Sequence, residues 1–460
     1  MWKVKYMGNS VFEKYDAIVR KNEQLILDAE RYLYLNPELG FKEYKATEYL
    51  AEKFRALGYE LHMAEGITGF YTEIDTGRPG PKVLIFGELD AIICAEHPYA
   101  DKETGAAHSC GHNCQAATLL GIAAALKQPG ALDGLSGSFK LCAVPAEELL
   151  ETDFREELRQ KGTVKYYGGK VEFLWRGYFD DCDMAFMVHT MTNMEPYTIY
   201  MKKGSNGCVN KSIKYKGVAA HAGAAPNKGV NAFYAATLGI QAVNALRETM
   251  VDGEYARVHP IMTTGGQMVN AIPSEAVMEA HVRGASNAII KKVNDKVNRA
   301  FAASAASIGA SVEIHDRPGY SPVENDETML ELGHRVAPMC TTPDKIKYNP
   351  GRGGGCSDIG DIQCVMPAFH PYVSGANGKS HGNDYFITNP DSACVFSAVY
   401  QLVYLHELLK DDAAEAKKVL ANYTPVYKTR EEYFAAIDEF FKDKEAVIYN
   451  ENGTVKLDFQ

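Results

Sequence analysis

The chain has 460 residues and a mass of 50.6 kDa. A chain of this length usually folds around more than one hydrophobic core, so we expect two domains. Hydrophobic residues make up 46% and charged residues 23%, a composition typical of a globular protein. The net charge is -11, from 48 basic and 59 acidic residues, and no stripe of Lys and Arg offers a surface to a phosphate backbone. Nucleic acid is therefore not expected as a partner.

The N-terminal residues, the length of the apolar runs and the cysteines together indicate a cellular compartment. The first residues, Met1–Ser10, lack the apolar core of a secretion signal, and no later apolar run reaches the length of about 18 residues that a membrane span requires. Ten cysteines are scattered singly, which is typical of reduced thiols. We expect a cytoplasmic protein without a membrane partner.

The chain opens with helical periodicity and continues into a strand. Residues 16–58 have apolar residues at helical spacing, interrupted at Asn36–Pro37, so two helices are predicted. The apolar run Lys82–Phe86 is bounded by turn signals and predicts a buried strand. Glu88 and Asp90 lie just past its end.

Two further predicted strands lead directly into polar residues. A small-residue helix is predicted over Asn113–Lys127, followed by strands over Ser138–Val144 and Met184–Val188. Glu147-Glu148 follows the first of these strands, and His189 follows the second. Ligands of open α/β sheets gather beyond the carboxyl ends of the strands. Three strands therefore direct polar side chains toward one place.

The stretch 206–316 changes character and predicts a second, inserted domain. Its elements are strand (209–216), helix (230–249), strand (257–263), strand (276–282), helix (287–307) and strand (311–315). This β-α-β-β-α-β order is that of a small ferredoxin-like α+β domain. The predicted fold class is α/β, with a mixed central sheet flanked by helices, in domains 1–205, 206–316 and 317–460. The last segment ends in a charged, helical C-terminal extension.

Residues of metal-ligand type are dispersed along the chain. They are His108-Ser-Cys110-Gly-His112, Glu147-Glu148, His189 and His381. A thiolate, imidazoles and carboxylates on separate loops suit a catalytic divalent metal, whereas a structural zinc site usually has compact Cys pairs. Taken alone, Glu147-Glu148 would most often be a solvated acidic turn. The apolar strand before it and the partners elsewhere favour a metallohydrolase.

A set of motifs in one order spans most of the chain. They are Asn36-Pro-Glu-Leu-Gly-Phe-Lys-Glu43, Gly87-Glu-Leu-Asp-Ala91, His108-Ser-Cys-Gly-His112, Pro145-Ala-Glu-Glu148, His189, Ala220-His-Ala222 with Pro226, Asn270-Ala-Ile-Pro273, Arg283, Ser357-Asp358 and His381. In these motifs the chain resembles the M20 family of metallopeptidases and amidohydrolases. The similar branch contains aminobenzoyl-glutamate hydrolases, amino-acid-conjugate hydrolases and aminoacylases.

The resemblance implies a zinc-peptidase-like catalytic domain with one or two divalent ions, zinc or manganese. The implied ligands are Cys110, His112, Glu148, His189 and His381, with Glu147 as the general base. Neighbouring residues that leave a strand point in opposite directions, so one carboxylate can bind metal while the other faces water. By the same resemblance His108 braces the site, and Asp90 orients a ligand histidine or is a simple turn residue.

The chain departs from the commonest family pattern directly after the Cys-Gly-His motif. Asn113-Cys114 stands where Asp and another residue often follow. Asn113 is compatible with the aminobenzoyl-glutamate-type branch. Cys114 is either a supplementary soft ligand or a thiol that packs in a helix. The departure leaves the preferred metal open.

Three residues of the inserted domain have implied roles at the substrate. The resemblance implies that His221 crosses from the partner subunit of a homodimer and stabilises the oxyanion, and that Asn270 and Arg283 bind the free carboxylate of the substrate. A capping histidine and a surface salt bridge are the alternatives for His221 and Arg283. Arg352 is a further candidate for an acidic substrate side chain. Its Gly-rich loop lacks the Lys-Ser/Thr ending of a nucleotide-binding loop.

The expected activity is hydrolysis of the amide bond of an N-acyl or aminobenzoyl-type amino acid by metal-activated water, with release of the free amino acid. A cytosolic metallodipeptidase is the alternative, which differs in tolerating a free amino group on the acyl side. A non-catalytic metal-binding or peptide-binding relative would have a damaged base or ligand, whereas Glu147 and all five ligand positions carry competent residues.

Overall fold

The computed structural model describes residues 10–459 and forms two compact units. Unit 1 comprises the chain up to Gly204, Glu324–Arg352 and Asp361–Val426, and unit 2 comprises Ser205–Val323, Gly353–Gly360 and the chain from Tyr427 onward. Most of the N-terminal stretch on which the expectation about a secretion signal rests lies outside the described residues.

Unit 1 opens with three helices, α1 (Ser10–Arg20), α2 (Glu23–Leu35) and α3 (Tyr44–Ala56). The prediction of two helices was wrong in number, because a turn closes α1, where the Asn22 backbone N–H donates to the Val19 carbonyl oxygen at 2.8 Å. The predicted break after α2 is confirmed at Asn36–Pro37, since proline cannot continue a helix.

The central sheet of unit 1 has the strand order β1-β2-β6-β3-β7-β16. Its strands are β1 (His62–Met63), β2 (Phe70–Asp75), β3 (Lys82–Glu88), β6 (Ser138–Val144), β7 (Met184–Phe186) and β16 (Ala368–Phe369). The sheet is mixed, as predicted, because β3 is parallel to β6 and β7 whereas β2 is antiparallel to β6. Helix α4 (His112–Leu126) packs against β3, and its small residues are buried along its whole length.

A second sheet of unit 1 carries His189. It has the order β14-β9-β17-β18, with β15 paired to β9 and β8 (His189–Thr192) paired to β17 (Tyr372–Asn377). Its remaining strands are β9 (Ile199–Ser205), β14 (Val323–Glu324), β15 (Ile346–Gly353) and β18 (Phe386–Ile387). Other elements of the unit are β4 (Ile92–Ile93), β5 (Ala106–Ala107), α5 (Thr152–Gln160), α6 (Gly169–Trp175), α9 (Glu327–Cys340), η3 (Pro343–Lys345) and α10 (Ile359–Gln363).

One helical stretch, Asp391–Asn422, is long and apolar enough to cross a membrane by length and composition. It consists of the π-helical η4 (Asp391–Phe396) and α11 (Ser397–Asn422). Because 89% of its apolar window is buried within the protein, the stretch packs as a core helix of a globular unit.

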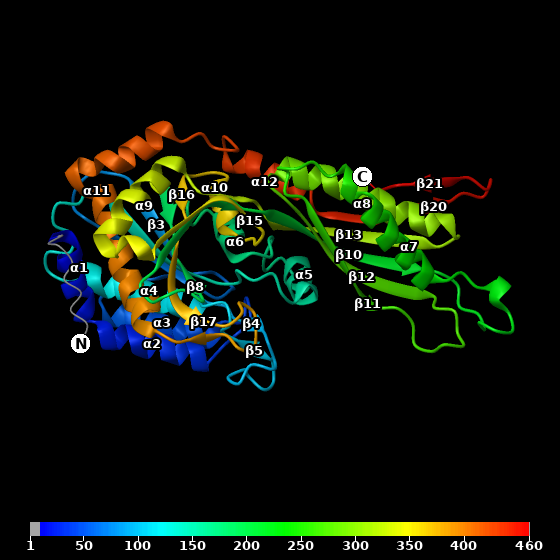
Figure 1. The fold of residues 1–460 in the computed structure, drawn as a ribbon, viewed down its shortest axis with the longest axis horizontal. Helices are drawn as coiled ribbons and strands as arrows, with labels where there is room; N and C mark the ends of the chain where they lie inside the picture. The colour runs from blue at the N-terminus through cyan, green and yellow to red at the C-terminus, as the bar shows by residue number, and fades with distance from the viewer. Residues whose placement is uncertain (1–9, 460) are drawn as a thin grey trace. The chain divides into compact units, whose positions relative to one another are not determined.

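Unit 2 is built on an antiparallel sheet with the order β11-β12-β10-β13-β19 (Figure 1). The strands are β10 (Gly207–Lys216), β11 (Arg257–Thr264), β12 (Glu275–Gly284) and β13 (Ser311–Tyr320), and the helices are η1 (Pro226–Lys228), α7 (Ala232–Ala245), η2 (Arg247–Thr249) and α8 (Asn287–Ser307). Both long helices pack on the sheet. The predicted ferredoxin-like element order is confirmed.

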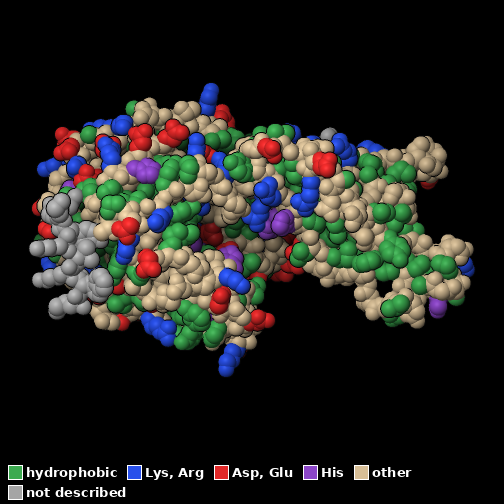
Figure 2. All heavy atoms as spheres, in the orientation of Figure 1, with side chains coloured by type: hydrophobic (Ala, Val, Ile, Leu, Met, Phe, Trp, Pro, Cys, Tyr) green, Lys and Arg blue, Asp and Glu red, His purple; other side chains and the backbone are tan. Residues whose placement is uncertain are grey.

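The C-terminal extension adds to this unit the helix α12 (Arg430–Asp438), the edge strand β19 (Lys442–Glu445) and the hairpin β20 (Val447–Tyr449) with β21 (Val455–Leu457). Strand β19 hydrogen-bonds to β13, and the extension is grouped with unit 2. The protein face in Figure 2 has Lys and Arg side chains interspersed with Asp and Glu.

The extension contributes buried apolar side chains, which gives a first prediction. Phe434 is 3% exposed and stacks edge-on with Tyr433. Phe434→Ala should lower the free energy of unfolding by about 3–5 kcal/mol through lost burial and a residual cavity. Urea unfolding followed by circular dichroism measures the effect, with the exposed Val455→Ala as the control. Equal stability of the two variants would show that the extension does not fold as part of unit 2.

Candidate active site and metal centre

The parallel register of two strands brings four carboxylates to one edge of the central sheet. Glu88, the last residue of β3, pairs with Val144, the last residue of β6. Asp90 and the Glu147-Glu148 pair therefore leave neighbouring strands at the same edge. This placement follows from the pattern of apolar strands ending in polar residues.

Asp90 connects the two strand ends to the start of helix α4. Its backbone carbonyl and its Oδ1 lie 2.9 and 3.1 Å from His112 Nδ1, and its Oδ2 accepts a hydrogen bond from the Glu148 backbone N–H at 2.8 Å. Contact with Nδ1 leaves His112 Nε2 as the nitrogen that faces the site. The contact expected between Asp90 and a ligand histidine is therefore present.

The turn before the glutamate pair is strained and braced. Ala146 has a φ of 54°, a conformation that side chains rarely adopt. Its backbone N–H donates to Glu43 Oε1 at 2.8 Å, and Thr68 Oγ1 donates to Glu43 Oε2 at 2.5 Å. Burial, with the nearby Asp90 charge, raises the pKa of Glu43 to about 8. Glu43 thus fixes the direction in which Glu147 leaves the strand.

The remaining candidate ligands come from three separate segments. His189 begins β8, and its Nε2 lies 3.4 Å from Cys110 Sγ while its Nδ1 lies 2.8 Å from the Thr190 carbonyl oxygen. His381 Nε2 lies 2.9 Å from Glu148 Oε1. The His381 backbone N–H donates to the Ser109 carbonyl oxygen, which ties this loop to the Cys110 segment.

All six predicted ligand and base residues of unit 1 converge. Their ligand atoms form three groups in which every atom lies within 4.8 Å of the others: Cys110 with His112 and His189, Cys110 with Glu148 and His381, and His112 with Glu147 and Glu148. Cys110, His112 and Glu148 each belong to two groups, so the clusters are adjoining.

The spacing of the donor atoms suits a divalent ion. Metal bonds of about 2.0–2.3 Å to N, O and S place neighbouring ligand atoms roughly 3–3.6 Å apart. The Cys110–His189 and Glu148–His381 separations of 3.4 and 2.9 Å are close to this range. His112 Nε2 is buried without a hydrogen-bond partner, an arrangement that a metal ion would satisfy. The residues present therefore fit a metal centre.

The electrostatic surroundings favour the thiolate form of Cys110. Burial raises the pKa of the thiol, but the neighbouring imidazoles of His112 and His189 outweigh it and hold the pKa well below its usual range. The thiolate is the form that binds metal.

From the sequence, four further residues have a supporting or open role, and the structure defines the surroundings of each. His108 is 2% exposed, and burial lowers the pKa of its ring to about 3. Asn113 Nδ2 donates to Glu30 Oε1 at 2.9 Å. Cys114 is fully buried in the apolar core and joins none of the ligand groups formed by the described residues, which favours a packing role. Arg352 forms an ion pair with Glu324.

No role was assigned to Glu88 from the sequence. Of the two carboxylates that lie near His112 Nε2, Glu88 is the closer one. Its Oε2 is 3.2 Å from His112 Nε2, against 3.9 Å for Glu147 Oε2. The sequence feature that could have pointed to Glu88 is its position at the end of an apolar strand, two residues before Asp90.

In unit 2, His221 and Asn270 lie together at one end of the sheet. His221 and Ala271 form an isolated β-bridge, and the Ala222 backbone N–H donates to the Asn270 carbonyl oxygen at 2.9 Å. His221 Nδ1 accepts hydrogen bonds from the backbone N–H groups of Gly223 and Ala224. Its Nε2 therefore carries the proton and can donate to a ligand.

Arg283 lies near the opposite end of strand β12. It lies eight positions along the strand from Glu275, or roughly 27 Å at about 3.4 Å per residue. Its guanidinium donates to the Gly354 carbonyl oxygen at 3.3 Å and lies 3.0 Å from Cys356 Sγ. Within one chain, the structure does not bring Asn270 and Arg283 together.

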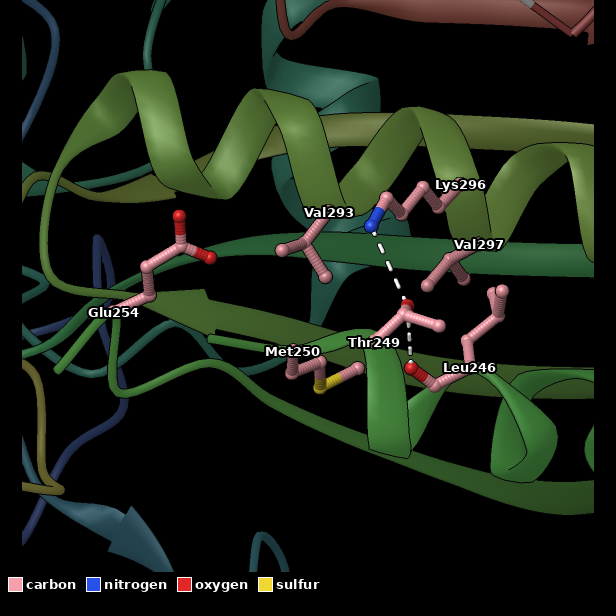
Figure 3. A pocket seen from close by; sticks show the side chains of 7 residues that line it. All are labelled: Leu246, Thr249, Met250, Glu254, Val293, Lys296 and Val297. Atoms are coloured by element: carbon pink, nitrogen blue, oxygen red, sulfur yellow. Dashed lines mark hydrogen bonds between the residues drawn. The ribbon is translucent and has the colours of Figure 1, made fainter. Parts of the chain in front are cut away.

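A small hollow in unit 2 has no part in this chemistry. It lies between η2 and α8 and measures about 10 Å³, with Val293, Val297 and Met250 on its walls (Figure 3). Lys296 Nζ donates to Thr249 Oγ1 across it. That volume is at most enough for one water molecule.

Comparison with known proteins identifies the inserted unit. Residues 203–308 match the peptidase dimerisation domain of the M20 family. The chain contains an M20 peptidase dimerisation domain. The relatives to which the chain is similar are named as hydrolases and peptidases.

Three curated relatives span several specificities. The human Xaa-Arg dipeptidase is 29% identical over 77% of this chain and 78% of its own length. The hippurate hydrolase of Campylobacter jejuni is 27% identical over 78% of this chain and 90% of its own length. A p-aminobenzoyl-glutamate hydrolase polypeptide of Escherichia coli is 33% identical over 54% of this chain and 55% of its own length.

Solved structures show the same fold. A putative aminohydrolase from methicillin-resistant Staphylococcus aureus superposes with a TM-score of 0.70 at 21% identity, covering 85% of this chain and 99% of its own. A dinuclear metal-binding M20 peptidase from Bacillus subtilis superposes with a TM-score of 0.65 at 22% identity and the same coverage.

The two contacts of Asp90 generate the second prediction. In Asp90→Asn only one side-chain oxygen remains, so either the Glu148 backbone N–H loses its acceptor or His112 Nδ1 loses the side-chain contact and keeps only the backbone carbonyl of residue 90. Loss of a partner that orients a ligand typically lowers metal affinity about 10–100-fold. Competition for zinc with a chromogenic chelator measures the affinity, and the exposed Asp75→Asn serves as the control. An unchanged affinity in Asp90→Asn would contradict an orienting role.

Proposed function

We propose that the protein is a metal-dependent amidohydrolase that cleaves N-acyl or aminobenzoyl-type amino acids. The observation that supports this most strongly is the set of three adjoining ligand groups in unit 1, with the carboxylate of Glu147 in one of them. The hippurate and p-aminobenzoyl-glutamate hydrolases among the relatives act on substrates of this class, as their names state.

One or two divalent ions would be held by Cys110, His112, Glu148, His189 and His381. The mixed sulfur, nitrogen and oxygen donors favour zinc, and manganese also suits such a set. When bound there, such an ion would supply Lewis acidity toward the amide carbonyl and would lower the pKa of water at the site.

Glu147 would be the group that transfers protons. It is 7% exposed, and its Oε2 lies 3.9 Å from His112 Nε2. As general base it takes a proton from the attacking water while the oxygen adds to the amide carbon. As general acid it returns that proton to the amide nitrogen, so that the C–N bond breaks and the amine leaves neutral.

The substrate's free carboxylate would be bound by Arg283, whose planar fork can donate two parallel hydrogen bonds. Asn270 and His221 lie at the other end of β12, so one chain cannot apply all three residues to one small substrate. We therefore propose a homodimer through the dimerisation domain, in which His221 and Asn270 act on the substrate of the partner subunit. His221 would donate from Nε2 to the developing oxyanion.

A metallodipeptidase is the second candidate, and the dipeptidase among the relatives supports it. It would use the same residues and differ in accepting a free amino group on the acyl side. A cytoplasmic location is also proposed, since all ten cysteines are free thiols. The proposed partners are small N-acyl amino acids or dipeptides.

The third prediction tests the chemistry with a panel of N-acyl amino acids, aminobenzoyl-glutamate and plain dipeptides. Glu147→Gln should lower kcat by about 10²–10⁴-fold, since the amide cannot accept the water proton, while the bound metal stays at the wild-type amount. Release of the free amino acid is measured by chromatography, and metal by elemental analysis. Full turnover by Glu147→Gln would exclude Glu147 as the base, and turnover of dipeptides alone would select the second candidate.

The fourth prediction tests action across subunits. Glu147→Gln and His221→Ala homodimers should each be nearly inactive, because loss of an oxyanion donor costs about 10²–10³-fold in kcat. After subunit exchange in an equal mixture, half of the dimers are mixed, and each mixed dimer contains one complete site. Activity should then recover to about one quarter of the wild-type value. No recovery, with exchange verified by mass spectrometry, would place His221 in the same chain as its Glu147.

A further inference from the structure

A buried carboxylate beside His112 lies outside the ligand set described so far. We infer that Glu88 is an additional ligand of the ion at His112, and that Lys170 is the positioning residue that fixes its orientation. The inference rests on the proposed function, because it concerns the same metal centre, and it adds a carboxylate that the motif resemblance does not assign.

The first support is the place of Glu88 relative to the free nitrogen of His112. With Nδ1 engaged by Asp90, Nε2 is the nitrogen available to metal. Glu88 Oε2 lies 3.2 Å from that Nε2. This is the separation expected of two atoms bound to one ion with bonds of about 2.1 Å. An ion that binds His112 Nε2 therefore lies within reach of Glu88 Oε2.

The second support is the rigidity of the carboxylate. Lys170 Nζ donates to Glu88 Oε1 at 2.5 Å, and Gln115 Nε2 donates to Glu88 Oε2 at 2.5 Å. Glu88 and Lys170 are 0% exposed and Gln115 is 3% exposed. Because Lys170 occupies Oε1, the oxygen left to face His112 is Oε2. A carboxylate oxygen can accept the Gln115 hydrogen bond and bind a metal at the same time, since it has two lone pairs.

The third support is energetic. Removing an ammonium and a carboxylate from water is costly, and an apolar pair of similar volume is often as stable or more stable. Stability alone therefore gives little reason for a fully buried Lys170–Glu88 pair at the end of β3. A role at the ion does give one, since the lysine holds the carboxylate in a fixed orientation before metal binds.

The test compares metal binding by wild type, Glu88→Gln and a matched control, Glu172→Gln. Glu172 lies in α6 two residues after Lys170, is 2% exposed and forms an ion pair with Arg176, but is in none of the ligand groups of the described residues. Chelator competition gives the affinity for zinc, and the visible absorption of the cobalt-loaded protein reports the ligands around the ion.

Glu88→Gln should bind zinc at least about 10-fold more weakly and give an altered cobalt spectrum, the scale expected for loss of a group that acts on the ion. Glu172→Gln should match wild type in both measurements. Unchanged affinity and spectrum in a folded Glu88→Gln would overturn the inference and leave Glu88 as a structural partner of Lys170. Absence of metal binding by wild type would instead contradict the proposed function itself.

A second variant guards against a misfolded Glu88→Gln. Lys170→Met leaves the Glu88 charge buried without its cation, which should lower the Tm of the metal-free protein. If Glu88 binds the ion, zinc compensates that charge, so saturating zinc should raise the Tm of Lys170→Met by more degrees than that of wild type. An equal rise in the two proteins would contradict direct binding by Glu88.

Discussion

The candidate site depends on the carboxylate of Asp90. One of its oxygens contacts the ring of His112 at the start of α4, and the other accepts the backbone N–H of Glu148 after β6. A single side chain thus sets the angle of an imidazole and the path of the loop that carries the proposed base and a proposed ligand. The contact with His112 is buried and the contact with Glu148 is partly buried, so the loss of either would leave a polar group with fewer partners where little water can replace them.

Around this contact the site is assembled from loops that begin at the ends of buried strands. The loops have backbone conformations that cost free energy unless neighbouring residues stabilise them. Ala146 and His381 both have positive φ values, and Gly111 has a φ of 96°. Each of the two non-glycine residues is fixed by a neighbour, the Ala146 N–H by Glu43 and the His381 N–H by the Ser109 carbonyl. The strain is therefore supported by hydrogen bonds within unit 1, and the ligand atoms stay close together.

Much of this arrangement could be predicted from the sequence, because alternating apolar runs and turn residues define strands and parallel strands place their ends at one edge. The bounds of β6 and α8 agree with the prediction to the residue. What was not predicted depends on contacts between distant residues. The pairing of β19 with β13 joins residues more than a hundred positions apart, and the contact of Glu88 with His112 depends on side-chain directions that no periodicity encodes. The turn that separates α1 from α2 was missed for a local reason, since Lys21 and Asn22 interrupt the helix without proline or glycine.

The geometry of β12 shapes how the dimerisation domain could take part in catalysis. An antiparallel sheet holds its strands in fixed register, so the ten residues of β12 keep Arg283 and the His221–Asn270 end apart. Bending the strand enough to bring them together would break its hydrogen bonds to β10 and β11. A substrate as small as an N-acyl amino acid can meet both groups only if they come from different chains. In the homodimer proposed above, symmetry would supply this arrangement twice, because the same surface patch of each chain would face the other. A chain of this design would be catalytically incomplete alone, and the dimerisation domain would serve as part of the active site.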